Sequence, residues 1–322
     1  MTNPLQTAGA RPGRAPWPPL VGELLSRCCF PPAGEAVVCA VSGGADSLAM
    51  LALAVAAGCQ AHALHVDHGL RPGSAQEMAL VMAAAAALGA TCESVKVQIA
   101  PGGDIEARAR RARYEVLPDG VLVGHTADDQ AETLLLNLLR GAGLDGLAGM
   151  RAEGGGHRHV RRPILALRRH ETAALARALD LEVVDDPSNH WPQFRRNRAR
   201  YEVMPLLADV AGRDPVPLLA RAASLLAEDA DLLRSLSEGL DPTDTRALQA
   251  APAPLARRAL RSWLRDGPEH HPPSATELER VWQVVVGRAV ACEIAGGRRV
   301  SRSSGRLRLH QPARATEGTR PT

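Results

Sequence analysis

The stretch Val37-Val38-Cys39-Ala40-Val41-Ser42-Gly43-Gly44-Ala45-Asp46-Ser47 decides the fold of this chain. Its apolar, β-branched first half predicts a buried strand, which ends abruptly in a turn rich in serine and glycine. An alanine- and leucine-rich pattern begins directly after the turn and predicts a helix that runs to about Ala57. The stretch therefore predicts a strand–loop–helix unit with its glycines at the join.

The loop of this unit has the chemistry of an anion site. The backbone N–H groups of residues 43–45 face the same point as the helix N-terminus, and Ser42 and Ser47 add hydroxyl donors. Asp46 would repel a phosphate, so its carboxylate is expected to hold Mg²⁺ beside one. The alternative left open by these residues is a tight turn in which serine and aspartate only cap the helix.

Strand and helix patterns then alternate along the chain. Further strands are predicted at 60–67, 91–97 and 121–123, and helices at 74–88, 105–116 and 127–139. This order predicts a Rossmann-like parallel sheet with helices on both faces. Ligands of such sheets bind outside the carboxyl ends of the strands, which is where the polar motifs of this chain fall.

The rest of the chain gives further helices and short strands. Helices are expected at 20–30, 168–181, 218–236, 252–265 and 274–286, short strands at 161–165, 289–294, 298–300 and 306–309, and a Gly-Gly turn at 296–297. The last helices and strands predict a smaller α+β domain whose core includes Trp263 and Trp282. The expected division is a flexible arm and short helix at 1–35, a nucleotide-binding domain at 36–207, a linker helix at 208–245, a second domain at 246–310 and a disordered tail at 311–322.

Composition limits the classes of protein that the chain could belong to. It has 322 residues, of which 45% are hydrophobic but only 2% aromatic, so alanine, valine and leucine must build the core. The net charge is +3 and Lys96 is the only lysine, so total charge says little about nucleic acid and local arginine clusters must decide. Six cysteines without a Cys-x-x-Cys pair, and no signal peptide or membrane-spanning run, predict a reduced, cytoplasmic protein.

Two polar clusters allow both a functional and a structural interpretation. His125 and Asp129 lie one helical turn apart and share a face, as a proton-transfer or metal-binding pair requires, although acidic residues there also complement the helix dipole. Four arginines within residues 195–200 are of the kind that phosphate backbones attract, or they form a solvated face.

The motifs resemble those of known enzymes. The string Ser-Gly-Gly-Ala-Asp-Ser is neither a Walker A loop nor a dinucleotide turn, and it resembles the PP-loop of the ATP pyrophosphatases, which cleave ATP between the α- and β-phosphates. Five further segments resemble the tRNA(Ile)-lysidine synthetases, one branch of these enzymes: residues 65–71 (HVDHGLR), 109–114 (ARRARY), 124–133 (GHTADDQAET), 137–147 (NLLRGAGLDGL) and 186–207, with the last containing FRRNRAR and PLL. Residues 162–165 (RPIL) are similar to the RPLL of that family.

The resemblance covers residues 36–207, and more weakly the region after 245. It implies a ligase that modifies the wobble cytidine of the isoleucine tRNA with the anticodon CAU. ATP would adenylate the C2 oxygen of cytosine with release of pyrophosphate, and the amine of free lysine would then displace AMP to give lysidine. The implied cofactors are ATP and Mg²⁺, the implied partners are this tRNA and lysine, no membrane is involved, and a homodimer is compatible with the motifs.

The resemblance also implies roles for individual residues. The ATP-binding loop would be Ser42, Gly43, Gly44, Ala45, Asp46 and Ser47, with Asp46 and Asp129 as Mg²⁺ ligands. The catalytic group would comprise Asp46, Arg71, His125, Asp129 and Arg140. The residues expected to bind tRNA or substrate are His65, His68, Arg110, Arg113, Tyr114, Glu132, Arg162, Arg196, Asn197 and Arg200.

Other functions remain open at this point. Another PP-loop enzyme that modifies tRNA or forms an amide is one alternative, although the chain lacks the cysteine clusters usual in sulfur-inserting thiolases. A non-catalytic tRNA-binding relative is a second alternative, which the intact Ser42, Asp46 and Ser47 disfavour.

Overall fold

The computed structural model describes residues 16–67, 74–97, 105–154, 159–184, 191–265 and 273–311. The chain divides into two structural units, residues 1–227 and 228–322. The division falls inside a long helix, α10 (Val216–Glu238), in the region expected as a linker.

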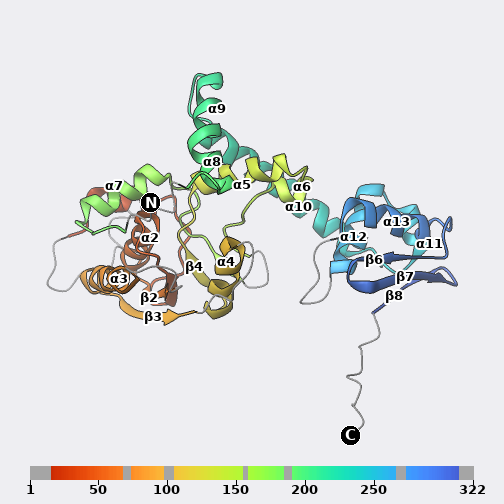
Figure 1. The fold of residues 1–322 in the computed structure, drawn as a ribbon, viewed down its shortest axis with the longest axis horizontal. Helices are drawn as coiled ribbons and strands as arrows, with labels where there is room; N and C mark the ends of the chain where they lie inside the picture. Colours follow the sequence, from red (N-terminus) through yellow and green to blue (C-terminus); the bar gives the residue numbers. More distant parts are fainter. Residues whose placement is uncertain are drawn as a thin grey trace, which may run out of the picture. The chain divides into compact units, whose positions relative to one another are not determined.

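A five-stranded parallel sheet organises the first unit (Figure 1). Its spatial order is β3-β2-β1-β4-β5, formed by Ala36–Ala40 (β1), Gln60–Asp67 (β2), Thr91–Lys96 (β3), Val121–Val123 (β4) and Val160–Arg161 (β5). The chain runs outward from β1 to β3 and then returns to place β4 on the other side of β1. The Rossmann-like parallel sheet expected from the sequence is therefore confirmed, and the reversal of strand order lies between β1 and β4.

Helices cover both faces of this sheet. The bounds in the first unit are Pro19–Leu25 (α1), Ala45–Ala56 (α2), Ser74–Leu88 (α3), Ile105–Val116 (α4), Ala127–Leu139 (α5), Leu144–Leu147 (α6) and Arg169–Ala178 (α7). Helices α1, α2, α3 and α7 share one apolar cluster with β1. Tyr114 of α4 packs instead with a second cluster, which includes Leu64 and Val121, so α4 lies on the opposite face.

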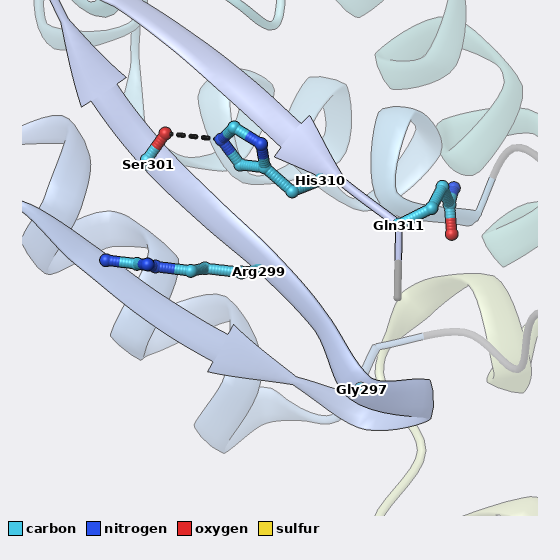
Figure 2. Close-up of a pocket in the computed structure, with 5 residues that line it drawn as sticks. All are labelled: Gly297, Arg299, Ser301, His310 and Gln311. Carbon is cyan, nitrogen blue, oxygen red and sulfur yellow. Dashed lines mark hydrogen bonds between the residues drawn. The ribbon is translucent and has the colours of Figure 1, made fainter. Parts of the chain in front are cut away.

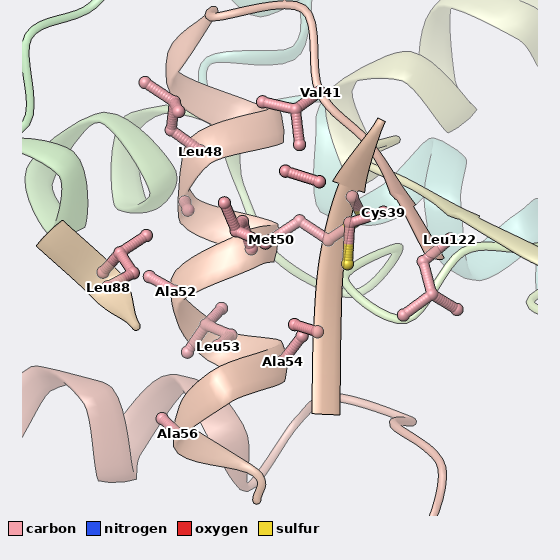
Figure 3. Close-up of a cluster of buried hydrophobic side chains, with 14 of the residues drawn as sticks. Cys39, Val41, Leu48, Met50, Ala52, Leu53, Ala54, Ala56, Leu88 and Leu122 are labelled. Atoms are coloured by element: carbon pink, nitrogen blue, oxygen red, sulfur yellow. The ribbon is translucent and has the colours of Figure 1, made fainter. Parts of the chain in front are cut away.

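Helix α2 is the centre of the core. Nearly every residue from Ser47 to Ala56 is buried, which fits the alanine- and leucine-rich sequence of this helix. Figure 3 shows Met50 of α2 directed toward Cys39 of β1, and Cys39 is fully buried. Burial raises the pKa of the Cys39 thiol to about 12, so this cysteine behaves as a small apolar side chain.

Three elements are clearly shorter than the sequence predicts. The first helix ends at Leu25 instead of reaching Phe30. The strand expected at 161–165 is only Val160–Arg161, because the chain turns after Arg162 with a hydrogen bond from Leu165 N–H to the carbonyl of Arg162. The helix expected at 168–181 ends at Ala178, followed by Asp180 with a positive φ of 52°.

The arginine-rich segment forms a helix interrupted by one wide turn. It comprises Arg195–Arg198 (α8), the π-helical Ala199–Val203 (η3) and Met204–Ala211 (α9). Pro205 has no N–H to donate and its ring crowds the preceding turn, which is the kind of site where a π-turn replaces regular α-helix.

The second unit is a small α+β domain. Its helices are Thr245–Ala250 (α11), Ala253–Arg265 (α12) and Ala275–Val285 (α13), and its antiparallel sheet has the order β6-β7-β8, formed by Ala291–Ile294, Arg298–Ser303 and Arg306–His310. Trp263 and Trp282 pack against its apolar core, as expected. The turn at Gly296 and Gly297 requires glycine, because both have positive φ values, 75° and 67°.

Within the described ranges, no helix combines the length and the apolar character needed to cross a bilayer. The six cysteines are free thiols.

Candidate active site

The loop after β1 is closed by the hydroxyl of Ser47. This hydroxyl donates to the carbonyl oxygen of Gly44 at 2.9 Å and accepts from the backbone N–H of Ser42 at 3.2 Å. No side chain caps the N-terminus of α2, where Gly44 is the capping residue. The first N–H groups of the helix are therefore left for a ligand, as an anion site requires.

Gly43 holds the loop against a neighbouring segment. Its φ is +85°, and a Cβ added to it would lie 2.7 Å from a methyl carbon of Val184. The backbone N–H of Val184 also donates to the carbonyl of Gly43 at 3.0 Å. Both the backbone conformation and the close approach explain why glycine stands here.

The loop after β4 meets the loop after β1 at the point where strand order reverses. A Cβ added to Gly124 would lie 2.9 Å from the backbone oxygen of Asp46 and 3.0 Å from Cα of Ser47. The glycine therefore allows backbone-to-backbone contact between the two loops, which brings Asp46 close to the start of α5.

This contact gives a first testable expectation. Replacing Gly124 by alanine should lower the free energy of unfolding by about 1–3 kcal/mol, because backbone atoms cannot move aside as a flexible side chain can. Gly143→Ala is the matched control, since its added Cβ meets nothing within 4 Å. Chemical denaturation of both variants tests the expectation, and equal losses for the two would contradict it.

The carboxylate of Asp46 contacts two residues of α7. One of its carboxylate oxygens accepts a hydrogen bond from the hydroxyl of Thr172, and the other lies 3.6 Å from Nε of Arg169. Burial raises the pKa of Asp46 to about 6, against the opposing effects of Thr172 and Arg169. A second cation at this carboxylate would favour its ionised form.

Asp129 lies in the first turn of α5 and is also buried. Its Oδ2 accepts from the backbone N–H and the hydroxyl of Thr126, at 2.9 and 3.0 Å, which completes a capping box. Its Oδ1 lies 3.0 Å from Arg169, the same arginine that contacts Asp46. Burial acts to raise the pKa of Asp129, but Arg169 and the Thr126 N–H outweigh it and hold the pKa below its ordinary value.

Glu132 is the most buried member of the cluster, with 2% of its side chain exposed. Arg200 Nε lies 2.8 Å from its Oε1, Arg169 lies 3.2 Å from the same oxygen, and Arg196 Nε lies 3.3 Å from its Oε2. Three guanidinium groups therefore share one carboxylate. We call Asp46, Asp129 and Glu132 the carboxylate cluster.

His125 is held by a buried arginine. Nε of Arg162 donates to Nδ1 of His125 at 3.1 Å, and its NH1 donates to the carbonyls of Arg151 and Gly154, each at 2.9 Å. Because Nδ1 accepts, the neutral ring carries its proton on Nε2. Arg162, which was expected to bind tRNA or substrate, is 7% exposed and supports His125 and the adjacent loop in this structure.

The arginine cluster does not form one basic face. Arg196 and Arg200 turn inward to Glu132, whereas Arg198 pairs on the surface with Glu202. Sequence spacing could not separate these roles, because the π-turn changes which residues share a side of the helix. Asn197 is buried and donates to the carbonyl of Trp191 at 2.9 Å, so its amide anchors the segment.

Several other expected site residues lie elsewhere. His65 is 3% exposed, and its Nδ1 donates to the carbonyl of Val41. Val41 directly precedes the phosphate loop, so this hydrogen bond fixes the chain where the loop begins. Tyr114 packs on the face of the sheet, and Arg113 beside it is exposed near the end of α4 that leads away from the site. Arg140 follows α5 and is exposed about 16 Å along the helix from Asp129, so the structure does not bring it to the cluster.

The side chains of three expected site residues lie outside the part of the chain that the structure describes. His68 and Arg71 lie outside the described residues, and for Arg110 only the backbone in α4 is described.

Sequence reasoning missed the residues that join the cluster together. Arg169 and Thr172 begin α7 and reach Asp46, and Arg168 beside them binds Asp128 at 3.0 Å. The available signal was a pair of arginines shortly after the polar end of β5, but helical periodicity placed them only at the start of the helix expected at 168–181.

The second unit has a polar recess on the open face of its sheet. It is lined by Gly297, Arg299, Ser301, His310 and Gln311. Figure 2 shows His310 directed toward Ser301, to which its Nε2 is hydrogen-bonded at 2.8 Å. Arg299 pairs with His310, and Ser301 with Arg308, in the β7–β8 register, so these four side chains share one face.

Comparisons with known proteins agree with this architecture. A family model described as the PP-loop domain matches residues 23–207, and one described as the TilS substrate binding domain matches residues 244–308. Among solved structures, the U34-tRNA thiolase NcsA from Methanococcus maripaludis is similar with a TM-score of 0.50 and 17% identity, covering 65% of this chain and 78% of that one. This likeness concerns the fold.

Curated relatives are similar over most of the chain. A tRNA(Ile)-lysidine synthase of Nocardia farcinica is 42% identical over 307 residues, which cover 89% of this chain and 95% of the relative. A protein of the same name from Rhodococcus erythropolis is 43% identical over 249 residues, covering 72% of this chain and 74% of the relative.

Proposed function

This chain belongs to the tRNA(Ile)-lysidine synthase family, and we propose that it ligates L-lysine to the wobble cytidine of the tRNA(Ile) with the anticodon CAU, using ATP. The observation that supports this most is the meeting of the Ser42–Ser47 loop with the carboxylate cluster at the reversal of strand order. A phosphate site and a cluster of acidic side chains on adjacent strand ends are what adenylation by ATP requires.

The proposed reaction has two steps, adenylation of the cytosine and its substitution by lysine. The C2 oxygen of the cytosine attacks the α-phosphate of ATP, and pyrophosphate leaves. The amine of lysine then attacks C2, loses a proton, and AMP departs. The free N–H groups at the start of α2, with the Ser42 hydroxyl, bind the leaving pyrophosphate, whose charge they stabilise.

Asp46 and Asp129 are the two carboxylates proposed to hold Mg²⁺. Mg²⁺ is usually held by one or two carboxylates together with substrate phosphates, so Asp46 and Asp129 suffice without a full protein cage. Both already contact one cationic group, Arg169, which shows that a cation is stabilised between them. No group of three or more potential ligands is present among the described side chains. Bound there, Mg²⁺ would neutralise charge on the phosphates.

The decisive experiment is transfer of radiolabelled lysine to unmodified tRNA(Ile) bearing CAU, in the presence of ATP and Mg²⁺. Methionine tRNA, which shares the anticodon, is the matched control substrate. Label in the isoleucine tRNA alone is expected. If the protein binds tRNA(Ile) but transfers no label, the amine donor or the nucleoside is different and the proposal fails.

The tRNA is also proposed to contact the open face of β6–β8. Arg299, Arg308 and His310 project from this face, and Glu293 is the acidic side chain in register with Arg299. Arg298 cannot contribute, because it is 2% exposed and donates to the carbonyls of Leu264 and Ala295. The exposed guanidinium groups of Arg299 and Arg308 are suited to the sugar-phosphate backbone.

A double variant tests this surface. Replacing Arg299 and Arg308 by alanine should weaken tRNA binding by about tenfold or more and lower the slope of log Kd against log salt by about 1–2. Arg257→Ala is the control, since Arg257 lies on α12 in the same unit with its side chain 57% exposed. Filter binding at several salt concentrations provides the measurement, and an unchanged salt slope in the double variant would remove this face from the interface.

A further inference from the structure

Arg169 occupies the centre of the carboxylate cluster. Its Nε lies 3.6 Å from Asp46, and its two terminal nitrogens lie 3.0 Å from Asp129 and 3.2 Å from Glu132. One guanidinium therefore contacts all three acidic side chains. The rigid planar fork of arginine allows this, because its donors point to different acceptors at once.

The three carboxylates depend on Arg169 to different degrees. Glu132 also has Arg196 and Arg200, and Asp129 also has Thr126 and a more distant contact to Arg200 at 3.7 Å. For Asp46, Arg169 is the one basic partner found in the part of the chain that the structure describes. The Asp46–Asp129 link is thus made by a single side chain.

The backbone of Arg169 is fixed while its side chain spans the site. Its N–H donates to Asp128 at 2.8 Å, and three residues later Thr172 donates to Asp46 and to the carbonyl of Arg169. A change in the guanidinium position therefore needs only side-chain rotation, without movement of α7.

We propose that Arg169 is a positioning residue that competes with the divalent cation: its guanidinium holds Asp46 and Asp129 together in the nucleotide-free enzyme and releases Asp46 when the metal binds. This rests on the proposed function, in which Mg²⁺ uses the same two carboxylates. The reason is electrostatic and steric. Mg²⁺ needs oxygen ligands at about 2.0–2.1 Å, so a second cation cannot stay between the same oxygens.

Once Arg169 has released Asp46, its guanidinium can bind a second partner. Asp46 belongs to the loop of residues 42–47, so a guanidinium freed from its carboxylate is close to the anion site and can bind phosphate oxygens in the same forked manner.

Direct metal binding tests the proposal. Free Mn²⁺, a paramagnetic substitute for Mg²⁺, is titrated by electron paramagnetic resonance against the full chain without ATP, tRNA or lysine. Arg169→Gln should bind Mn²⁺ about tenfold tighter than the native protein, because the competing charge is gone. Arg168→Gln is the matched control: it removes the neighbouring arginine, which pairs with Asp128 and Asp214, and should leave the affinity unchanged.

The outcomes separate competition from a merely structural role. Affinity that is equal or weaker in a folded Arg169→Gln variant overturns the proposal, as does an equal gain in Arg168→Gln. If the glutamine variant does not fold, Arg169→Lys replaces it. Lysine keeps the charge but not the fork, so its Mn²⁺ affinity should exceed that of the native protein, and an unchanged value overturns the proposal. Because tRNA and lysine are absent, failure of lysine transfer and failure of this competition are observed separately.

Discussion

Replacing Asp46 by asparagine is expected to lower the single-turnover rate of lysine transfer to CAU-bearing tRNA(Ile) about 10³-fold, or about 4 kcal/mol. Asparagine has the same shape and can still accept from Thr172, but it removes the charge beside the phosphate loop. It also removes one of the carboxylates that hold Arg169 between the start of α2 and the start of α5. The loss should appear in the chemical step, with tRNA binding unchanged.

Thr172→Val provides the matched control for this result. Valine keeps the Asp46 charge and removes only the hydroxyl that donates to it, so a rate decrease of about tenfold is expected. Circular dichroism and tRNA binding should verify that both variants fold. An Asp46→Asn enzyme that keeps more than a tenth of the native rate would show that the charge of Asp46 is not used in adenylation.

Replacing Glu132 by glutamine is expected to cause the largest loss of stability. Three guanidinium groups converge on this buried carboxylate, and removing it leaves them partly buried without their shared anion. Removal of one partner from a buried ion pair costs about 3–5 kcal/mol, and we expect about 3 kcal/mol here because each arginine retains some solvent contact. For a unit of this size, that lowers Tm by about 6–12 °C.

The exposed pair Arg198–Glu202 is the internal comparison. It has the same chemistry at 2.8 Å in a neighbouring helix turn, but both side chains are in water. Glu202→Gln should therefore leave Tm unchanged. Differential scanning calorimetry of both variants measures the contrast. Equal Tm values for the two would mean that Glu132 is not needed to hold Arg196 and Arg200 in place.

The sequence by itself determined the fold class and the location of the site. The apolar run 37–41 followed by Ser-Gly-Gly predicts the strand and the phosphate loop, because a buried parallel strand needs continuous apolar residues and the close turn needs glycine. The helices at 74–88, 105–116 and 127–139 have the bounds that their periodicity predicted. Asp46, Asp129 and Glu132 were assigned to the site because the motifs that contain them resemble those of the tRNA(Ile)-lysidine synthetases.

Only the tertiary structure decided which charges meet. Arg162, Arg196 and Arg200 were expected to face tRNA or substrate, but they bind His125 and Glu132 inside the first unit. Arg169, which sequence reasoning assigned to an ordinary helix, is the residue that joins Asp46 to Asp129. The reason is physical: local patterns set secondary structure, whereas the partner of a long flexible arginine depends on which loops the sheet order brings together, here β1 and β4 with the start of α7.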